Sequence, residues 1–278
     1  MRWKRQELLL ELEQDRARRI LFVEGDRDLS FCRELLPADK ATNAVIYPIS
    51  AVECDPVQGG ERGRLVQTAA FFETTPAAQR VHFFADANGD RLLKNQLPSN
   101  ITLTDGRDLE GYGLEPICIG RICAVGFPGI TKTPDEILAK VRELARPIGI
   151  LRAASQRAQL GLAFRRTFER NGPDRFIIPG DPLKVDMARL ILTLMQNSDI
   201  PLRTMMNVVA TYDAEVENLN GLPDEQIIHG KDSLALLARE FGVSPKEMER
   251  LLFFAMSSEL NRIRRQKNIA SIVRWLED

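Results

Sequence analysis

The sequence predicts an α/β protein in which a parallel sheet flanked by helices is followed by a mostly α-helical C-terminal part. Short apolar runs alternate with amphipathic segments up to about residue 116, which is the pattern of βαβ units. After residue 133 long helical patterns take over. Because 278 residues exceed the usual size of one domain, we expect two domains, residues 1–125 and 126–278.

The first half contains four expected strands, each short, rich in aliphatic and aromatic residues and bounded by turn residues. They cover residues 20–24, 44–50, 81–86 and part of 100–115. Expected helices cover residues 6–18, 28–36, where Pro37 ends the pattern, and 62–73. Pro48 predicts that the second strand lies at an edge or ends there, because proline cannot donate to a ladder.

The sequence predicts that the second half is helical, with a single short strand at 175–180. The expected helices cover residues 134–170 with a break near Pro147, 182–196, 201–218, and 231–276 with a break at 242–245.

Composition favours an ordinary soluble protein of the cytoplasm. The formal net charge is −1, so any binding of nucleic acid would need local basic patches. No stretch approaches the ~20 apolar residues of a membrane span, and the charged amphipathic N-terminus does not read as a signal peptide. Cys32 and Cys118 lie in apolar surroundings and are expected to be buried as small hydrophobes.

Two apolar runs, ILFVEGDRD (20–28) and VHFFADANGD (81–90), lead straight into acidic residues. Ligands of open parallel sheets bind outside the carboxyl ends of the strands, so Glu24 and Asp86 are expected to converge. Mg²⁺ is held by one or two carboxylates together with water and substrate phosphates. Glu24, Asp86 and Asp90 are therefore candidate ligands of Mg²⁺, with Mn²⁺ as the alternative, and Glu110 is the candidate for a second ion.

Each part of this pattern also has a purely structural interpretation. Residues 86–90 can be a polar turn, and Asp26 and Asp28 can cap the following helix. In the functional interpretation, Gly25 and Gly89 are expected to permit tight turns beside the ion.

These residues resemble the TOPRIM domain shared by topoisomerases, primases and OLD-type nucleases. Its hallmarks are a strand ending in Glu-Gly and a later strand ending in Asp-x-Asp. FVEGDRD matches the first with Glu24 and Gly25, and FFADANGD matches the second with Asp86. Asn88 stands at the second aspartate position and Asp90 follows two residues later, so the further ligand is either Asn88 or Asp90.

Two further segments resemble elements of the single-domain TOPRIM proteins of bacterial anti-phage systems: TDGRDLEGYGLE (104–115) and HGKDSLALL (229–237). The GKDS string is not a Walker A motif, because Glu225 replaces the first glycine and Asp232 follows the lysine. By analogy with OLD nucleases, Lys231 would stabilise charge in the transition state. The structural alternative places Gly230 in a turn and Asp232 at the start of a helix.

Within this group the chain looks most like the TOPRIM nuclease effectors of the PARIS defence system, which work with a separate ABC-type ATPase. The resemblance implies a Mg²⁺-dependent endonuclease with a toxic, antiviral role. It also favours RNA over DNA as the substrate, with tRNA as a candidate target and DNA as the open alternative. It further implies control by an ATPase partner and a homodimer when active.

Basic residues recur between 140 and 175 and again between 262 and 267, which favours contact with nucleic acid. The alternative is that each cluster is the solvated face of an amphipathic helix. The candidate contacts are Arg157, Arg165, Arg166, Arg264 and Arg265.

Two other hypotheses stay open. In one, the TOPRIM scaffold survives as a non-catalytic interaction subunit, which Asn88 favours. In the other, the chain is a topoisomerase- or primase-like enzyme; this is disfavoured because the chain lacks room for the extra catalytic domains and none of its three tyrosines has a nucleophilic context.

Overall fold

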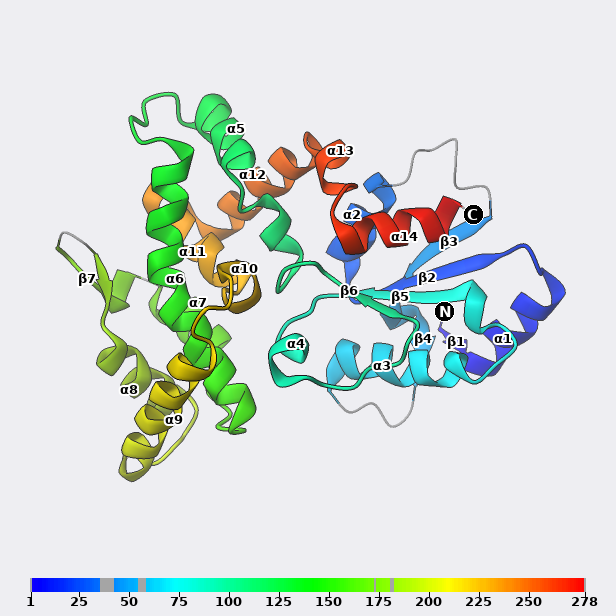
Figure 1. Cartoon of the computed structure of the whole chain (residues 1–278), viewed down its shortest axis with the longest axis horizontal. Coiled ribbons are helices and arrows are strands. Elements are labelled where there is room, and N and C mark those ends of the chain that lie inside the picture. Colours follow the sequence, from blue (N-terminus) through cyan, green and yellow to red (C-terminus); the bar gives the residue numbers. More distant parts are fainter. Residues whose placement is uncertain (1, 36–42, 55–58, 173, 181–182, 278) are drawn as a thin grey trace. The chain divides into compact units, whose positions relative to one another are not determined.

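The computed structural model describes residues 2–35, 43–54, 59–172, 174–180 and 183–277 (Figure 1). Its contacts divide the chain into two compact units. The sheet unit comprises Met1–Ala87, Asn95–Leu109 and Ser257–Asp278, and the helical unit comprises Asn88–Lys94 and Glu110–Met256. This division differs from the expected boundary at 125/126. The expected helix end at Pro37 lies outside the described residues.

The sheet unit is built on a four-stranded sheet in the order β3-β2-β5-β6, and all neighbouring strands are parallel. The strands are β2 (Arg19–Val23), β3 (Ala44–Pro48), β5 (Val81–Ala85) and β6 (Ile101–Leu103). The expected α/β class with a parallel sheet is confirmed. So is the expectation from Pro48, because β3 lies at the edge of the sheet and Pro48 is its last residue.

Helices cover the sheet on both faces, as buried parallel strands require (Figure 1). On one face, Leu12 and Leu65 from helices α1 and α3 share a buried cluster with Phe22 and Phe83 of the central strands. On the other face, the ring of Trp275 in α14 lies 5.3 Å from the ring of His82 in β5. The helices of this unit are α1 (Arg5–Gln14), α2 (Asp26–Leu35), α3 (Gly60–Glu73), α13 (Leu260–Ile263) and α14 (Lys267–Glu277), and a short pair joins β1 (Trp3–Lys4) to β4 (Val52–Glu53).

The last helix of the chain belongs to the sheet unit, although its sequence position placed it in the expected helical domain. Helix α14 buries Ile269, Ile272 and Leu276. Its Trp275 also donates from Nε1 to the carbonyl oxygen of Gln79, 3.1 Å away. The amphipathic pattern of α14 was visible in the sequence, but the surface that it covers was not.

The helical unit consists of helices around buried clusters such as the one formed by Leu151, Phe164 and Leu194. Its α5, which was not expected from the sequence, ends at Gly126. Of the described residues, no helix is long and apolar enough to cross a membrane. The elements are α4 (Asp90–Leu93), α5 (Pro116–Gly126), α6 (Pro134–Arg157), α7 (Phe164–Asn171), α8 (Met187–Asn197), α9 (Met205–Asn218), α10 (Asp224–Ile227), α11 (Gly230–Phe241), α12 (Pro245–Ser257) and the hairpin of β7 (Ile177–Ile178) with β8 (Lys184–Val185).

The expected helix break near Pro147 is wrong, because α6 runs through this residue without interruption. The chain leaves the helix only at Ala158, and Gln159 follows with a positive φ of 52°. An internal proline costs about 3 kcal/mol of helix stability. The helix buries Leu144, Ile148 and Leu151 around the proline, and this packing offsets the cost.

Gly149 marks a close approach of α6 to α10, and its replacement tests the packing. A Cβ atom at Gly149 would lie 2.4 Å from the carbonyl oxygen of Ile227. We expect Gly149→Ala to lower the free energy of unfolding by about 2 kcal/mol through overpacking, as measured by urea denaturation. The matched control is Gly126→Ala, where nothing lies within 4 Å, and it should be neutral or slightly stabilising. Equal effects of the two substitutions would contradict this account.

His82 makes the stability of the sheet unit dependent on pH. Burial lowers the pKa of His82 to about 4, and its Nε2 lies 2.8 Å from Oγ1 of Thr102. Because the folded state disfavours the proton, the contribution of His82 is complete above the unfolded pKa of about 6.5 and is lost as the pH falls towards 4. We expect roughly 3 kcal/mol of the free energy of unfolding to be lost over this range in the wild type. Denaturation of His82→Gln should show a smaller loss, and identical pH profiles would refute the assignment.

Candidate functional site

The two leading acidic candidates follow adjacent parallel strands at the same edge of the sheet. Val23 of β2 pairs with Phe84 of β5, so Glu24 comes directly after this pair and Asp86 comes one residue further along, after Ala85. Standard strand spacings place their Cα atoms about 6 Å apart. The sequence therefore correctly placed these two residues at neighbouring strand ends.

Glu24 lies beside a cation that the sequence analysis missed. Nη1 of Arg62 lies 3.6 Å from Oε2 of Glu24, and the two side chains are 20% and 25% exposed. Arg62 stands in the first turn of α3, the helix that crosses over from the β3–β4 segment to β5. Crossover helices begin at the carboxyl edge of the sheet, and this was the signal that could have identified Arg62.

Asp86 is held by the backbone of a neighbouring loop. Its Oδ1 accepts a hydrogen bond from the N–H of Leu109 at 2.9 Å. The loop that leads to Leu109 is itself joined to the end of β5, because the N–H of Thr104 donates to Ala85 and Oγ1 of Thr104 accepts from the N–H of Ala87, both at 2.9 Å. One carboxylate oxygen of Asp86 is therefore fixed relative to the sheet.

Neither glycine of these two turns has a positive φ. Gly25 does not adopt a positive φ, and its N–H donates to Oδ2 of Asp28 at 2.9 Å, which confirms the capping interpretation of Asp28. In the second turn it is Asn88 that has a positive φ of 45°, while Gly89 has an ordinary φ of −104°. A Cβ atom at Gly89 would lie 2.3 Å from Oε1 of Gln156, so a larger residue there would require the flexible end of this side chain to move.

Asp90 and Glu110, the further candidates for metal ligands, belong to the helical unit. Asp90 is the first residue of α4 and is half-buried, and Glu110 is only 4% exposed. Within the part of the chain that the structure describes, no group of three or more His, Cys, Asp or Glu side chains is close enough to hold a metal ion. The pair of Glu24 and Asp86 is thus the element of the predicted centre that the sheet brings together, and the other two ligands stay predictions.

The chemistry of this pair fits Mg²⁺ better than a metal that demands a closed protein cage. Mg²⁺ keeps several waters and uses one or two carboxylates plus phosphate oxygens of the substrate. Glu24 keeps a quarter of its side chain exposed, and Asp86 is half-buried. Both residues thus follow directly from the sheet and are partly exposed, while Oε2 of Glu24, the oxygen that faces Arg62, is itself buried.

The GKDS segment has a clear structural role. Helix α11 begins at Gly230, and the buried Asp232 in its first turn accepts from Nε and Nη2 of Arg152 at 2.6 and 2.7 Å. The structural alternative holds only in part, because Gly230 is the first residue of the helix and not part of a turn, and Asp232 is the third. Lys231 lies exposed in the same turn, and its backbone N–H donates to Nδ1 of His229 at 3.2 Å. Its proposed role in charge stabilisation stays a prediction.

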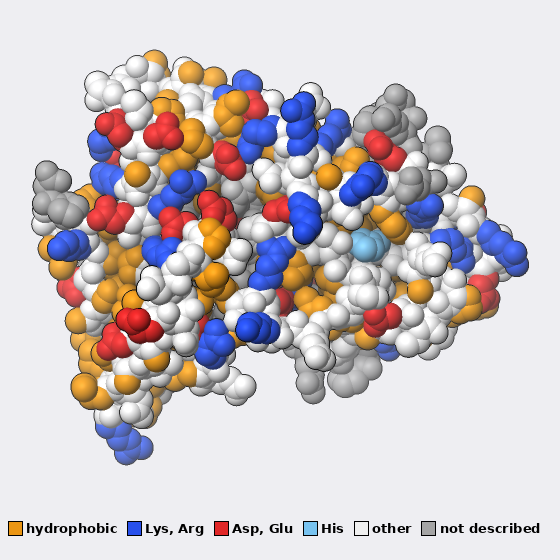
Figure 2. Space-filling view, viewed as in Figure 1, with side chains coloured by type: hydrophobic (Ala, Val, Ile, Leu, Met, Phe, Trp, Pro, Cys, Tyr) orange, Lys and Arg blue, Asp and Glu red, His pale blue; other side chains and the backbone are white. Residues whose placement is uncertain are grey.

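Several candidate nucleic-acid contacts are engaged inside their own unit. Arg157 binds both carboxylate oxygens of Glu215, at 2.8 and 3.1 Å, and Glu215 is only 2% exposed. Arg166 donates to the carbonyl oxygen of Asn197 at 3.0 Å. On the face of the helical unit seen in Figure 2, blue and red side chains are interspersed.

In the second basic cluster, residues 262–267, one candidate arginine is engaged in a contact within its own unit. Nε of Arg264 donates to the carbonyl oxygen of Leu35 at 2.9 Å, which ties the segment before α14 to the end of α2. Arg165 and Arg265 are exposed. Arg157 and Arg166 are exposed as well, so exposure does not rank these candidates, and their contact with nucleic acid stays a prediction.

A scan of the sequence against protein-family models gave no match, and a search of curated proteins gave none either. The fold and the site define the class of this protein by themselves: a parallel α/β protein with two carboxylates at adjacent strand ends.

The ion pair between Arg152 and Asp232 predicts that Asp232 stabilises the fold, whereas the neighbouring Lys231 does not. We expect Asp232→Ala to lower the free energy of unfolding by about 3 kcal/mol, because it leaves the guanidinium of Arg152, 17% exposed, without its charge partner. The matched control is Lys231→Ala in the same turn, which should change stability by less than about 0.5 kcal/mol. Chemical denaturation of both variants measures the difference, and a loss of similar size in Lys231→Ala would contradict it.

Proposed function

We propose that this protein is a Mg²⁺-dependent nuclease in which Glu24 and Asp86 hold the metal ion. The observation that carries the proposal is the parallel pairing of β2 with β5, which sets these two carboxylates at neighbouring strand ends. The resemblance of FVEGDRD and FFADANGD to the TOPRIM hallmarks supports the same residues. Mn²⁺ is the alternative ion.

The ion would supply a Lewis acid that activates water and offsets charge on the phosphodiester. Glu24 and Asp86 would hold it, with Asn88 or Asp90 as a further ligand and Glu110 at a second ion. Arg62 would attract the substrate phosphate, since its guanidinium already lies beside Glu24. Lys231 would stabilise the charge that develops as the bond breaks.

The substrate in this proposal is RNA rather than DNA, with tRNA as the candidate target. The exposed Arg165 and Arg265 are suited to contact its backbone. The resemblance to PARIS effectors supports a toxic role in bacterial anti-phage defence, in the cytoplasm, under the control of an ABC-type ATPase. It also supports a homodimer as the active form. A net charge of −1 gives the single chain little long-range attraction for nucleic acid.

One observation favours a second candidate function, a non-catalytic interaction subunit. The cation of Arg62 is near enough to Glu24 to neutralise part of the charge that a metal ion would use. In that case the TOPRIM-like scaffold would bind a partner protein and would cleave nothing.

Cleavage assays with matched variants distinguish the two functions. Purified protein is incubated with total RNA, tRNA or plasmid in Mg²⁺ or Mn²⁺, with and without a chelator. We expect chelator-sensitive cleavage that falls about 100-fold or more in Glu24→Gln and in Asp86→Asn, because each loses a charged ligand of the ion. The control is Glu13→Gln, an exposed carboxylate of α1, which should keep full activity. Cleavage that persists unchanged in Glu24→Gln would refute the nuclease assignment.

A further inference from the structure

A chain of hydrogen bonds leads from the C-terminal helix to Asp86, wholly within the sheet unit. The backbone N–H of Asn268 in α14 donates to both carboxylate oxygens of Asp105, at 3.0 and 3.2 Å. Nδ2 of Asn268 donates to the carbonyl oxygen of Leu103, the last residue of β6, at 2.9 Å. Four residues after Asp105, the N–H of Leu109 donates to Asp86.

The segment between these two anchors is short and tightly bonded. Oγ1 of Thr104 accepts from the N–H of Ala87 and donates to the carbonyl oxygen of Gly106 at 3.1 Å. A loop of six residues, 104–109, is therefore fixed by α14 at one end and contacts the turn after β5 at the other. The same short loop therefore contacts α14 through Asp105 and the carboxylate of Asp86 through Leu109.

Electrostatic attraction also stabilises the contact between the carboxylate of Asp105 and the start of α14. The first N–H groups of a helix have no partner inside the helix, and the positive end of the helix dipole favours a carboxylate there. Asp105 supplies this cap from a position 163 residues away in the sequence. This hydrogen bond can form only when α14 is packed on the sheet unit.

We infer that Asp105 and Asn268 are positioning residues for Asp86, so that docking of the C-terminal helix sets the affinity of the carboxylate pair for its ion. The inference rests on the proposed function, because it takes Asp86 as a metal ligand. Partners that orient metal ligands typically change metal affinity about 10- to 100-fold when they are removed.

The test measures metal binding directly. Mn²⁺ affinity of the purified full chain is determined by electron paramagnetic resonance or calorimetry without nucleic acid, alongside thermal melting. We expect Asp105→Ala to weaken Mn²⁺ binding about 10-fold or more, and Asp105→Asn, which keeps an oxygen acceptor, to recover most of the affinity. Asn268→Ala removes only the bond to Leu103 and is the milder variant to use if Asp105→Ala does not fold.

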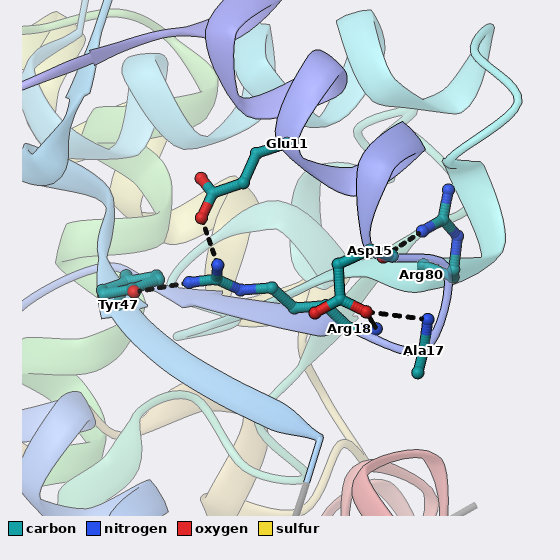
Figure 3. A network of polar contacts seen from close by, with 6 residues as sticks. All are labelled: Glu11, Asp15, Ala17, Arg18, Tyr47 and Arg80. Atoms are coloured by element: carbon teal, nitrogen blue, oxygen red, sulfur yellow. Dashed lines mark hydrogen bonds and ion pairs between the residues drawn. The ribbon is translucent and has the colours of Figure 1, made fainter.

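The matched control is Asp15→Ala. Asp15 also accepts backbone N–H groups in a turn of the sheet unit, from Ala17 and Arg18 at 3.1 and 3.2 Å (Figure 3). Because it precedes β2, it lies at the amino edge of the sheet, opposite to Glu24 and Asp86. It should lower the melting temperature without changing Mn²⁺ affinity. Unchanged affinity in both Asp105→Ala and Asn268→Ala, with weakened binding in Glu24→Gln, would overturn the positioning role alone. Unchanged affinity in Glu24→Gln as well would overturn the proposed function.

Discussion

The parallel register between β2 and β5 is the constraint on which the candidate site depends. The paired residues from Ile20 to Val23 are fully buried, and helices cover both faces of the sheet. In a strand that is buried on both faces, a shift by one residue would exchange the side chains of the two faces, so the packing specifies one register. The proximity of Glu24 and Asp86 follows from this register and not from the conformation of either loop.

Around that edge of the sheet, several acidic residues accept backbone N–H groups, and Asp86 is one of them. Asp28 accepts the N–H of Gly25, and Asp105 accepts the N–H of Asn268, so both carboxylates satisfy backbone groups that helix ends leave without partners. Glu24 and Asp86 are the acids that extend directly from adjacent strands. An acid-rich sequence therefore overstates the number of ligands, because helix capping uses the same residue types in the same loops.

In the helical unit, several basic residues likewise have structural roles. Arg152 and Arg157 each form a bidentate pair with a buried acid, Asp232 and Glu215 respectively, and these pairs join α6 to α11 and α9. Such pairs contribute orientation as much as net stability, since desolvation offsets most of the attraction. A run of arginines in the sequence thus serves the packing of helices here, and only the arginines left at the surface add to an attractive field.

The sequence by itself determined the α/β class, the four strands, the edge position of β3 and the placement of Glu24 and Asp86, because hydrophobic period and turn residues are local signals. Only the tertiary structure decided that α6 continues through Pro147, that Arg62 stands beside Glu24 and that α14 returns to the sheet. Each of these depends on contacts between segments far apart in the chain. A local pattern states which face of a helix is apolar, but the partner of that face is selected by the packing of the whole unit.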